Sequence, residues 1–528
     1  MRRYKQANEG IHAPEELKEK AARPSARRPY SRWMGAVAAV LAVAVIGGAA
    51  VGSGMFGRPG GEADSPAAYS LGEENRRGGR AATGLYALAV PDYPEMADYP
   101  NYEDFYGDAG GDDKAWEKAD QAYNQAYDSW SEDRAALRSG TNYTGLMDEF
   151  ISRSTAQILA GAGEKNRIYS PLNVYMALSM LAETTGGDTR QQILDLLQAD
   201  SVETLRQRAA GLWRDNYRDD GVVTSLLANS LWLRDGMTYS QDTLDTLAKD
   251  YYAASFSGPM GAEEYNQALR DWINEQTHGL LEKQAQGLEM NSDTVLALAS
   301  TLYFKAGWKD EFKQDRTKTD TFHAPSGDVD ADFMHQTITG SYYWGDNFTA
   351  VQLRFQQGGF MWLLLPAEGC SVDELLDSGE AMEFLLAPKA NQYDDKGNVT
   401  REGWAGQKHL DINLSMPKFD VSSDLSLVEG LKALGVTDVF DSTASNFDPL
   451  GASTDDPLYV SQVQHAARVK VDEEGCEAAA YTVISIENTA AMMPGDEVDF
   501  TLDRPFLFAV TGDSGLPLFV GNVNQPNG

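Results

Sequence analysis

The sequence predicts an α+β domain over most of its length, and three observations support this fold class. Residues 146–159 carry apolar side chains at helical spacing, and 169–197 reads as a buried helix, a Gly-Gly turn and a second helix. Apolar or alternating runs typical of strands follow at 226–234, 295–304 and 360–366. Helices followed by mixed strands and helices indicate an α+β domain, and nothing repeats at the period of a solenoid.

The composition limits the classes of function. The chain has 528 residues, of which 44 are basic and 79 acidic, for a net charge of −35. This charge repels phosphates, so we expect neither nucleic acid nor an anionic membrane surface as partner of the bulk of the chain. Hydrophobic residues make up 42%, which suffices for a large core. The only two cysteines, Cys370 and Cys476, cannot form a disulfide framework, so packing must stabilise the fold.

The N-terminus differs from the rest of the chain. Residues 1–32 form a basic head with nine Lys or Arg and four Glu, and an uncharged run follows at 33–51. Nineteen apolar or small residues in a helix just cross a hydrocarbon layer of ~30 Å. We therefore predict a transmembrane signal-anchor over 33–56, with the basic head in the cytoplasm and the following chain outside. The alternative is a signal peptide cleaved near 47–49, which would leave a secreted protein.

Residues 57–140 have the composition of a linker. They are acidic and rich in Gly, Asp, Pro and Tyr, so we expect an extended, solvated segment. Aromatic residues from Trp116 to Trp130 fall at helical spacing and predict one short helix. Packing on the domain or disorder is favoured for these residues over the binding of a glycan. The globular domain occupies 141–528.

Eight motifs follow one another through this globular part. They are IYSPLNVYMALSML, ANSLWL, WINEQTHGLL, LYFKAGWKDEF, LSMPKF, LYVSQVQHAARVKVDEEGCEAAA, RPFLFAV and LFVGNVNQP. Together they resemble the serpin family over residues 141–526. The resemblance implies three β-sheets, about nine helices and an exposed reactive-centre loop between the longest sheet and the C-terminal strands.

The resemblance also implies a mechanism. Inhibitory serpins offer the loop to a protease, which cleaves it and stays bound as an acyl-enzyme. The loop then inserts into the central sheet and drags the protease with it, which distorts the protease active site. The hinge that starts this insertion matches eight residues of the present chain, namely Glu473, Glu474, Gly475, Cys476, Glu477, Ala478, Ala479 and Ala480. The chain departs from the family at Cys476, where Thr or Ser is usual, and at Tyr481, where a small residue is usual.

The loop meets the physical demand that insertion makes on a sequence. A central strand alternates its side chains between two faces, and every second residue from Cys476 to Ile486 is uncharged and either small or β-branched. The other set runs from Glu477 to Glu487 and begins and ends with a charge, so we assign it, with Tyr481, to solvent. No proline interrupts this stretch. The alternation favours an inhibitor over a non-inhibitory serpin that acts as a substrate or a binding module at the cell surface.

Two positions for the cleaved bond remain open. The family spacing from the first hinge glutamate gives Thr489–Ala490, whereas alignment backwards from 497–500 gives Met492–Met493. Small residues suit elastase-like or subtilisin-like proteases. A bond at Met492 would suit elastase-like or chymotrypsin-like enzymes. The absence of Lys and Arg from residues 481–499 argues against a trypsin-like target, while a cysteine protease stays open as a second target class.

Serpins hold the central sheet closed with a buried polar cluster called the shutter. Ser170, Asn173, Ser300 and His465 match its positions. The family usually has Ser at position 173 and Asn at position 300, so the two residue types look exchanged. If the two side chains are neighbours, the exchange preserves hydrogen bonding; otherwise the two changes are unrelated. Trp308 matches the residue of the breach, where the loop first enters the sheet.

Catalytic and metal-binding motifs are absent from the sequence. It contains no G-x-S-x-G, H-E-x-x-H, C-x-x-C or phosphate-binding loop, and its six histidines lack metal-ligand spacing. We therefore predict a monomeric protein that is not an enzyme and needs no cofactor or metal. We expect two partners: a target protease, bound in a covalent complex, and a membrane, to which the N-terminal helix anchors the protein. We also expect the protein to be bacterial.

Overall fold

The computed structural model describes residues 84–107, 113–141, 143, 145–393, 399–451, 458–476 and 496–526. The predicted basic head and signal-anchor, residues 1–56, lie outside these ranges, and so do loop residues 477–495. Within the described part of the chain, no helix is both long and apolar enough to cross a membrane.

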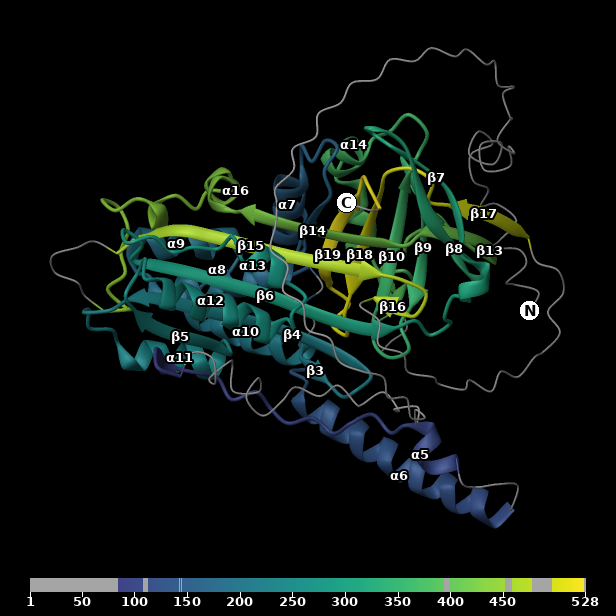
Figure 1. Cartoon of the computed structure of the whole chain (residues 1–528), viewed down its shortest axis with the longest axis horizontal. Helices are drawn as coiled ribbons and strands as arrows, with labels where there is room; N and C mark the ends of the chain where they lie inside the picture. The colour runs from purple at the N-terminus through teal and green to yellow at the C-terminus, as the bar shows by residue number, and fades with distance from the viewer. Residues whose placement is uncertain are drawn as a thin grey trace, which may run out of the picture. The chain divides into compact units, whose positions relative to one another are not determined.

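A large sheet organises the domain (Figure 1), with strand order β1-β5-β4-β6-β16-β15-β14 and β3 paired to β4. In this order the strands are β1 (Ala87–Ala89), β5 (Ala253–Gly258), β4 (Val223–Arg234), β6 (Leu296–Gly307), β16 (Gly475–Cys476), β15 (Val460–Val471), β14 (Phe419–Ser426) and β3 (Arg218–Asp219). Strand β4 is buried at every residue but the last. A strand buried on both faces reads as a continuous apolar run, which explains the run at 226–234.

Two further sheets complete the strands that the structure describes. One has nine strands, β17 (Glu497–Thr501), β13 (Gln407–Pro417), β8 (Gly327–Trp344), β9 (Phe348–Arg354), β10 (Phe360–Pro366), β18 (Phe506–Thr511), β19 (Pro517–Val523), β2 (Arg167–Tyr169) and β7 (Lys318–Ala324). The other is the pair β11 (Gln392–Tyr393) and β12 (Val399–Arg401).

The described residues form twelve α-helices, α5 to α16, rather than about nine. They are α5 (Tyr102–Tyr106), α6 (Asp113–Leu137), α7 (Asp148–Leu159), α8 (Pro171–Thr184), α9 (Gly187–Leu196), α10 (Val202–Asn216), α11 (Gln241–Asp250), α12 (Glu263–Gln276), α13 (Glu282–Ala285), α14 (Val372–Asp377), α15 (Glu380–Leu386) and α16 (Val428–Ala433). Two of them, α5 and α6, precede the region in which the family resemblance begins.

Helices α8 and α12 cover opposite faces of the large sheet. Ser170 is the N-cap of helix α8, and its hydroxyl accepts from the backbone N–H of Asn173. All residues of the helix are buried. It packs against the face of β6 that carries Leu298 and Ser300. Helix α12 lies over the other face, where Tyr265 contacts Trp232 of β4 at 5.2 Å between ring centroids.

Residues 84–99 and the C-terminal end of α6 pack against the domain, where the sequence predicted an extended, solvated linker with one short helix. Strand β1 pairs with β5, and Tyr93 is buried against Trp213 at 5.2 Å between ring centroids. Helix α6 has 25 residues, longer than the short helix expected, and its Trp130 is buried and donates to Asp220 at 3.2 Å. The aromatic side chains give this segment apolar surface that it can bury against the domain. Its acidic composition, taken alone, predicts a solvated segment.

Candidate functional site

The hinge begins between two strands of the large sheet. Gly475 and Cys476, which form β16, pair antiparallel with Gly307 and Ala306 of β6. On the other side Cys476 pairs antiparallel with Val471 of β15. Cys476 is buried, and the second cysteine, Cys370, is a free thiol. The first hinge residues thus already occupy the start of a strand position.

Side chains and backbone groups fix the turn that leads into β16. Glu473 accepts from Thr317 at 2.8 Å and forms an ion pair with Lys418 at 2.8 Å. Burial alone would raise the pKa of Glu473, but the bonds from Lys418 and Thr317 together lower it below its usual value. The carbonyl of Glu474 accepts from the Trp308 amide at 2.9 Å. The turn is therefore held by the side chains of Thr317 and Lys418 and by the backbone of Trp308.

Only glycine fits at position 475. A Cβ on Gly475 would lie 2.4 Å from the carbonyl oxygen of Ala306 and 2.8 Å from the Cα of Gly307. The neighbouring backbone would have to shift to admit it, and this close approach is what lets the chain enter beside β6.

Trp308 lies beside this turn, as the family resemblance implied. It is 1% exposed, and its indole N–H donates to the Asp472 carbonyl at 2.9 Å. Its ring stacks on Phe355 with the centroids 5.1 Å apart and the planes 9° apart. The indole therefore ties the turn before the hinge to the end of β6.

Below the hinge the large sheet is closed. Strands β6 and β15 pair directly and in parallel from Leu296 with Val460 to Ser300 with His465. Direct pairs between them end there, and the next pairs along β6 are those of the hinge. Over this stretch β6 and β15 are therefore direct neighbours, with no strand between them.

The four predicted shutter residues come together at the last direct pair. The backbone N–H of Ser170 donates to Nε2 of His465 at 3.1 Å, and the Asn173 N–H donates to the Ser170 hydroxyl at 3.3 Å. The Ser300 hydroxyl donates to the Asn173 carbonyl at 3.4 Å. These contacts join helix α8 to β6 and β15.

The exchange of residue types at 173 and 300 does not form a compensating pair. The side-chain partner of Ser300 is Asn229 of β4, whose carbonyl oxygen accepts at 2.9 Å. Both side-chain polar atoms of Asn173 are buried and find no hydrogen-bond partner among the described residues. The side-chain amide that bonds Ser300 therefore comes from Asn229. The side-chain amide of Asn173 is buried without a hydrogen bond to any described residue.

His465 is held neutral inside the core. Its Nε2 accepts from the Ser170 N–H, which leaves the ring proton on Nδ1, and no described group hydrogen-bonds to that atom. Burial lowers the pKa of His465 to about 4. A charged imidazole would thus oppose the closed sheet.

Sequence reasoning missed two contributors to the site. Asn229, followed by Ser230, interrupts a mainly apolar strand at 226–233, and a buried amide in such a run was the available signal. Lys418 lies in the LSMPKF motif, but only the fold brings it to Glu473. Eight predicted residues lie outside the described part, namely Glu477, Ala478, Ala479, Ala480, Thr489, Ala490, Met492 and Met493.

Comparisons with known proteins agree with this geometry. A family model described as Serpin (serine protease inhibitor) matches residues 147–526. Serpin-ZXA of rice is 30% identical over 411 residues, which covers 74% of this chain and 98% of the rice protein. The leukocyte elastase inhibitor of pig is 29% identical over 367 residues and covers 68% of this chain and 93% of its own length.

Solved structures show the same fold. Tengpin, a thermophilic serpin in its native state, superposes with a TM-score of 0.63 at 24% identity and covers 72% of this chain and 94% of its own. An Arabidopsis serpin in its native stressed conformation gives a TM-score of 0.59 at 25% identity and covers 74% and 100%. With the family model spanning most of the chain and the hinge and shutter geometry in place, the chain belongs to the serpin family of serine protease inhibitors, which are not enzymes.

Proposed function

We propose that this serpin inhibits an extracellular serine protease as a suicide substrate, by inserting its cleaved loop between β6 and β15. The hinge register carries this proposal, because Cys476 already pairs with both strands. Continued in the same register, Glu477 would lie between Lys305 of β6 and Lys470 of β15. Thr482 would lie between Ser300 and His465, the pair that now closes the sheet.

The two faces of the inserted strand support the proposal. Directly opposed residues of an antiparallel pair point to the same face, so Ala478, Ala480 and Thr482 would follow buried Cys476 toward α8. These residues are small or β-branched and suit a core. The charge of Glu477 would meet the lysines on the other face.

For the target we propose an elastase-like or subtilisin-like serine protease that cuts at Thr489–Ala490, with Met492–Met493 as the alternative bond. Small residues suit the shallow pockets of these enzymes, and relatives from pig and human are called leukocyte elastase inhibitor. We further place the domain outside a bacterial cell, tethered through residues 33–56, although the curated relatives named above come from rice, pig and human. Removal of the domain by protease treatment of intact cells would test this location.

Incubation with elastase and with subtilisin tests the mechanism. We expect a complex that survives SDS, and the mass of the released C-terminal fragment identifies the cleaved bond. Ala478→Arg would place a charge on the α8 face, so that variant should be cut without trapping. Cleavage of the unmodified protein without any complex would contradict inhibition and favour the plain substrate. A complex only with a cysteine protease would move the target to that class.

A further inference from the structure

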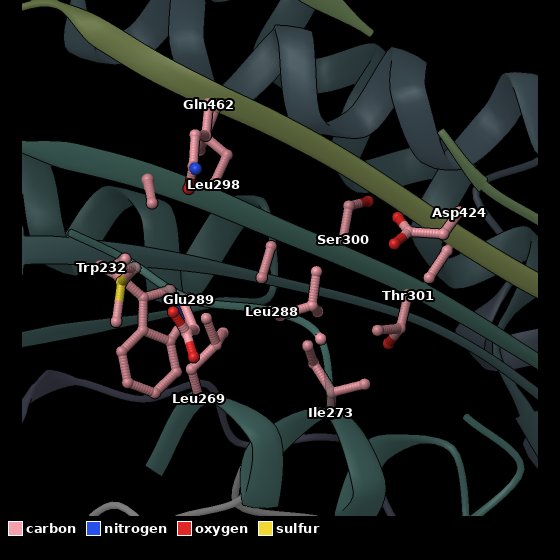
Figure 2. A pocket seen from close by; sticks show the side chains of 15 residues that line it. Trp232, Leu269, Ile273, Leu288, Glu289, Leu298, Ser300, Thr301, Asp424 and Gln462 are labelled. Atoms are coloured by element: carbon pink, nitrogen blue, oxygen red, sulfur yellow. The ribbon is translucent and has the colours of Figure 1, made fainter. Parts of the chain in front are cut away.

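A cavity lies between the large sheet and helix α12, next to the closed strand pair (Figure 2). Its volume is about 150 Å³. Leu269 and Ile273 reach into it from α12, and Leu288 adds apolar surface from the segment after α13. Thr301 of β6 and Ala466 of β15 line its other side. Glu289, Asp424 and Gln462 add polar groups to the lining. A cavity of about this size is large enough for a benzene ring.

The hinge register leads one loop residue to this cavity. Five residues after Cys476 is Tyr481, and five residues before its partners Ala306 and Val471 are Thr301 and Ala466. Both of these residues line the cavity. A regular continuation of the two ladders therefore brings Tyr481 between two cavity-lining residues.

The direction of the Tyr481 side chain follows from the same register. Opposed residues in an antiparallel pair share a face, and Thr301 lies on the α12 face together with Tyr303, whose ring is 4.8 Å from that of His278 just after α12. The second face of the loop is thus covered by protein at position 481. The sequence assigned this face to solvent, because alternation alone does not reveal what covers it.

We propose that the cavity beneath α12 is the binding site for the Tyr481 side chain in the inserted state. This inference rests on the proposed insertion of the loop. It gives a role to a bulky residue at a position where serpins usually have a small one. The ring would occupy this space between the separating strands, against the apolar side chains of Leu269, Ile273 and Leu288.

Thiol accessibility tests the proposal in the full-length protein. Tyr481→Cys and, as the matched control, Glu477→Cys are each made with Cys370→Ser and Cys476→Ser, and each is labelled before and after subtilisin cuts the loop. Position 477 would lie between Lys305 and Lys470, away from the cavity lining, and should stay reactive. We expect the cut to slow labelling at 481 by at least about tenfold, as for a group reached only through local opening.

A second readout separates this site from insertion itself. Cleaved Tyr481→Phe should resist guanidinium like the cleaved parent, while cleaved Tyr481→Ala should unfold at a lower concentration, and the uncut forms should unfold together. Equal labelling at 481 and 477 after a cut that stabilises the protein would overturn the cavity site and leave inhibition intact. Protection of 481 before any cut would also overturn it. A cut that brings neither protection nor stabilisation would contradict the proposed insertion and, with it, this site.

Discussion

Ser300 of β6 and His465 of β15 are the last residues that pair directly before the hinge, so the proposed insertion would have to separate the two strands first at the shutter. Between Ser300 and Ala306, all of them described residues, β6 has no direct pair with β15. The hinge lies at one end of this stretch, and the parallel pairing of β6 with β15 begins at the other. Four predictions follow from this arrangement and from the segment that precedes the domain.

A disulfide across the closed ladder should block inhibition. Ala297 and Gln462 pair directly, and neighbouring strands lie about 4.8 Å apart, within the Cα separation that a disulfide spans. We expect Ala297→Cys with Gln462→Cys, in a background without the native cysteines, to be cut without trapping when oxidised. Reduction should restore the SDS-stable complex. Each single variant serves as the control for the oxidant, and full trapping by the bridged protein would exclude insertion between these strands.

Mild acid should weaken the closed sheet through His465. The unfolded chain takes up a proton near the ordinary pKa of 6.5, while the folded chain does so only near 4. The contribution of this histidine to stability is thus complete above pH 6.5 and is lost as the pH falls from 6.5 to 4. The loss should reach on the order of 3 kcal/mol.

The measurement is the midpoint of denaturant unfolding of the uncut protein as a function of pH. His465→Gln keeps an acceptor for the Ser170 N–H but does not titrate, so its midpoint should fall less steeply between pH 6.5 and 4. Parallel curves for the two proteins would show that another group governs the acid response.

A methyl group at position 475 should displace the hinge. Gly475→Ala would bring its Cβ to 2.4 Å from the Ala306 carbonyl oxygen, and overpacking of this kind costs about 1–3 kcal/mol. We expect a lower unfolding midpoint and more cleavage events for each protease trapped. Gly340→Ala is the control, because nothing lies within 4 Å of its added Cβ. Equal behaviour of the two variants would contradict the tight approach of the hinge to β6.

Loss of Trp130 should detach the segment ahead of the domain. The indole is 4% exposed, donates to Asp220, and lies 5.6 Å from the guanidinium of Arg218. Trp130→Ala should cost about 3 kcal/mol and open residues 84–137 to limited proteolysis. Trp116 on the same helix is 39% exposed, so Trp116→Ala should change little. Similar proteolysis of the two variants would mean that the contacts of Trp130 do not hold the segment.

Local patterns were enough to point to the start of the hinge and to the shutter positions, while hinge residues 477–480 lie outside the described part of the chain. Alternation from Cys476 onward is readable residue by residue, and the motifs around Ser170 and His465 mark their strands and helix. The side-chain partner of Ser300 was not predictable, because Asn229 meets it only through the pairing of β4 with β6. Distant partners also explain the folded segment, since Trp130 finds Asp220 ninety positions along the chain.

The covered face of the loop shows the same limit in another form. Periodicity separates two faces of a strand but does not say whether water or a helix lies over each of them. The charges of Glu477 and Glu487 led to the prediction that solvent covers the whole face from Glu477 to Glu487. If the loop inserts as proposed, the helix over Thr301 would cover this face at its middle, at position 481.

Strand β1 bears on how the domain is best produced and handled. An unpaired sheet edge is a template on which a second molecule adds its own strand, a common start of aggregation. Here β1 covers β5 through the pairs of Ala87 with Phe256 and Ala89 with Ser255. A recombinant fragment trimmed to the family boundary, 147–526, lacks this cover and leaves the β5 edge bare. Residues that precede the family boundary therefore cover the β5 edge and should limit self-association of the domain.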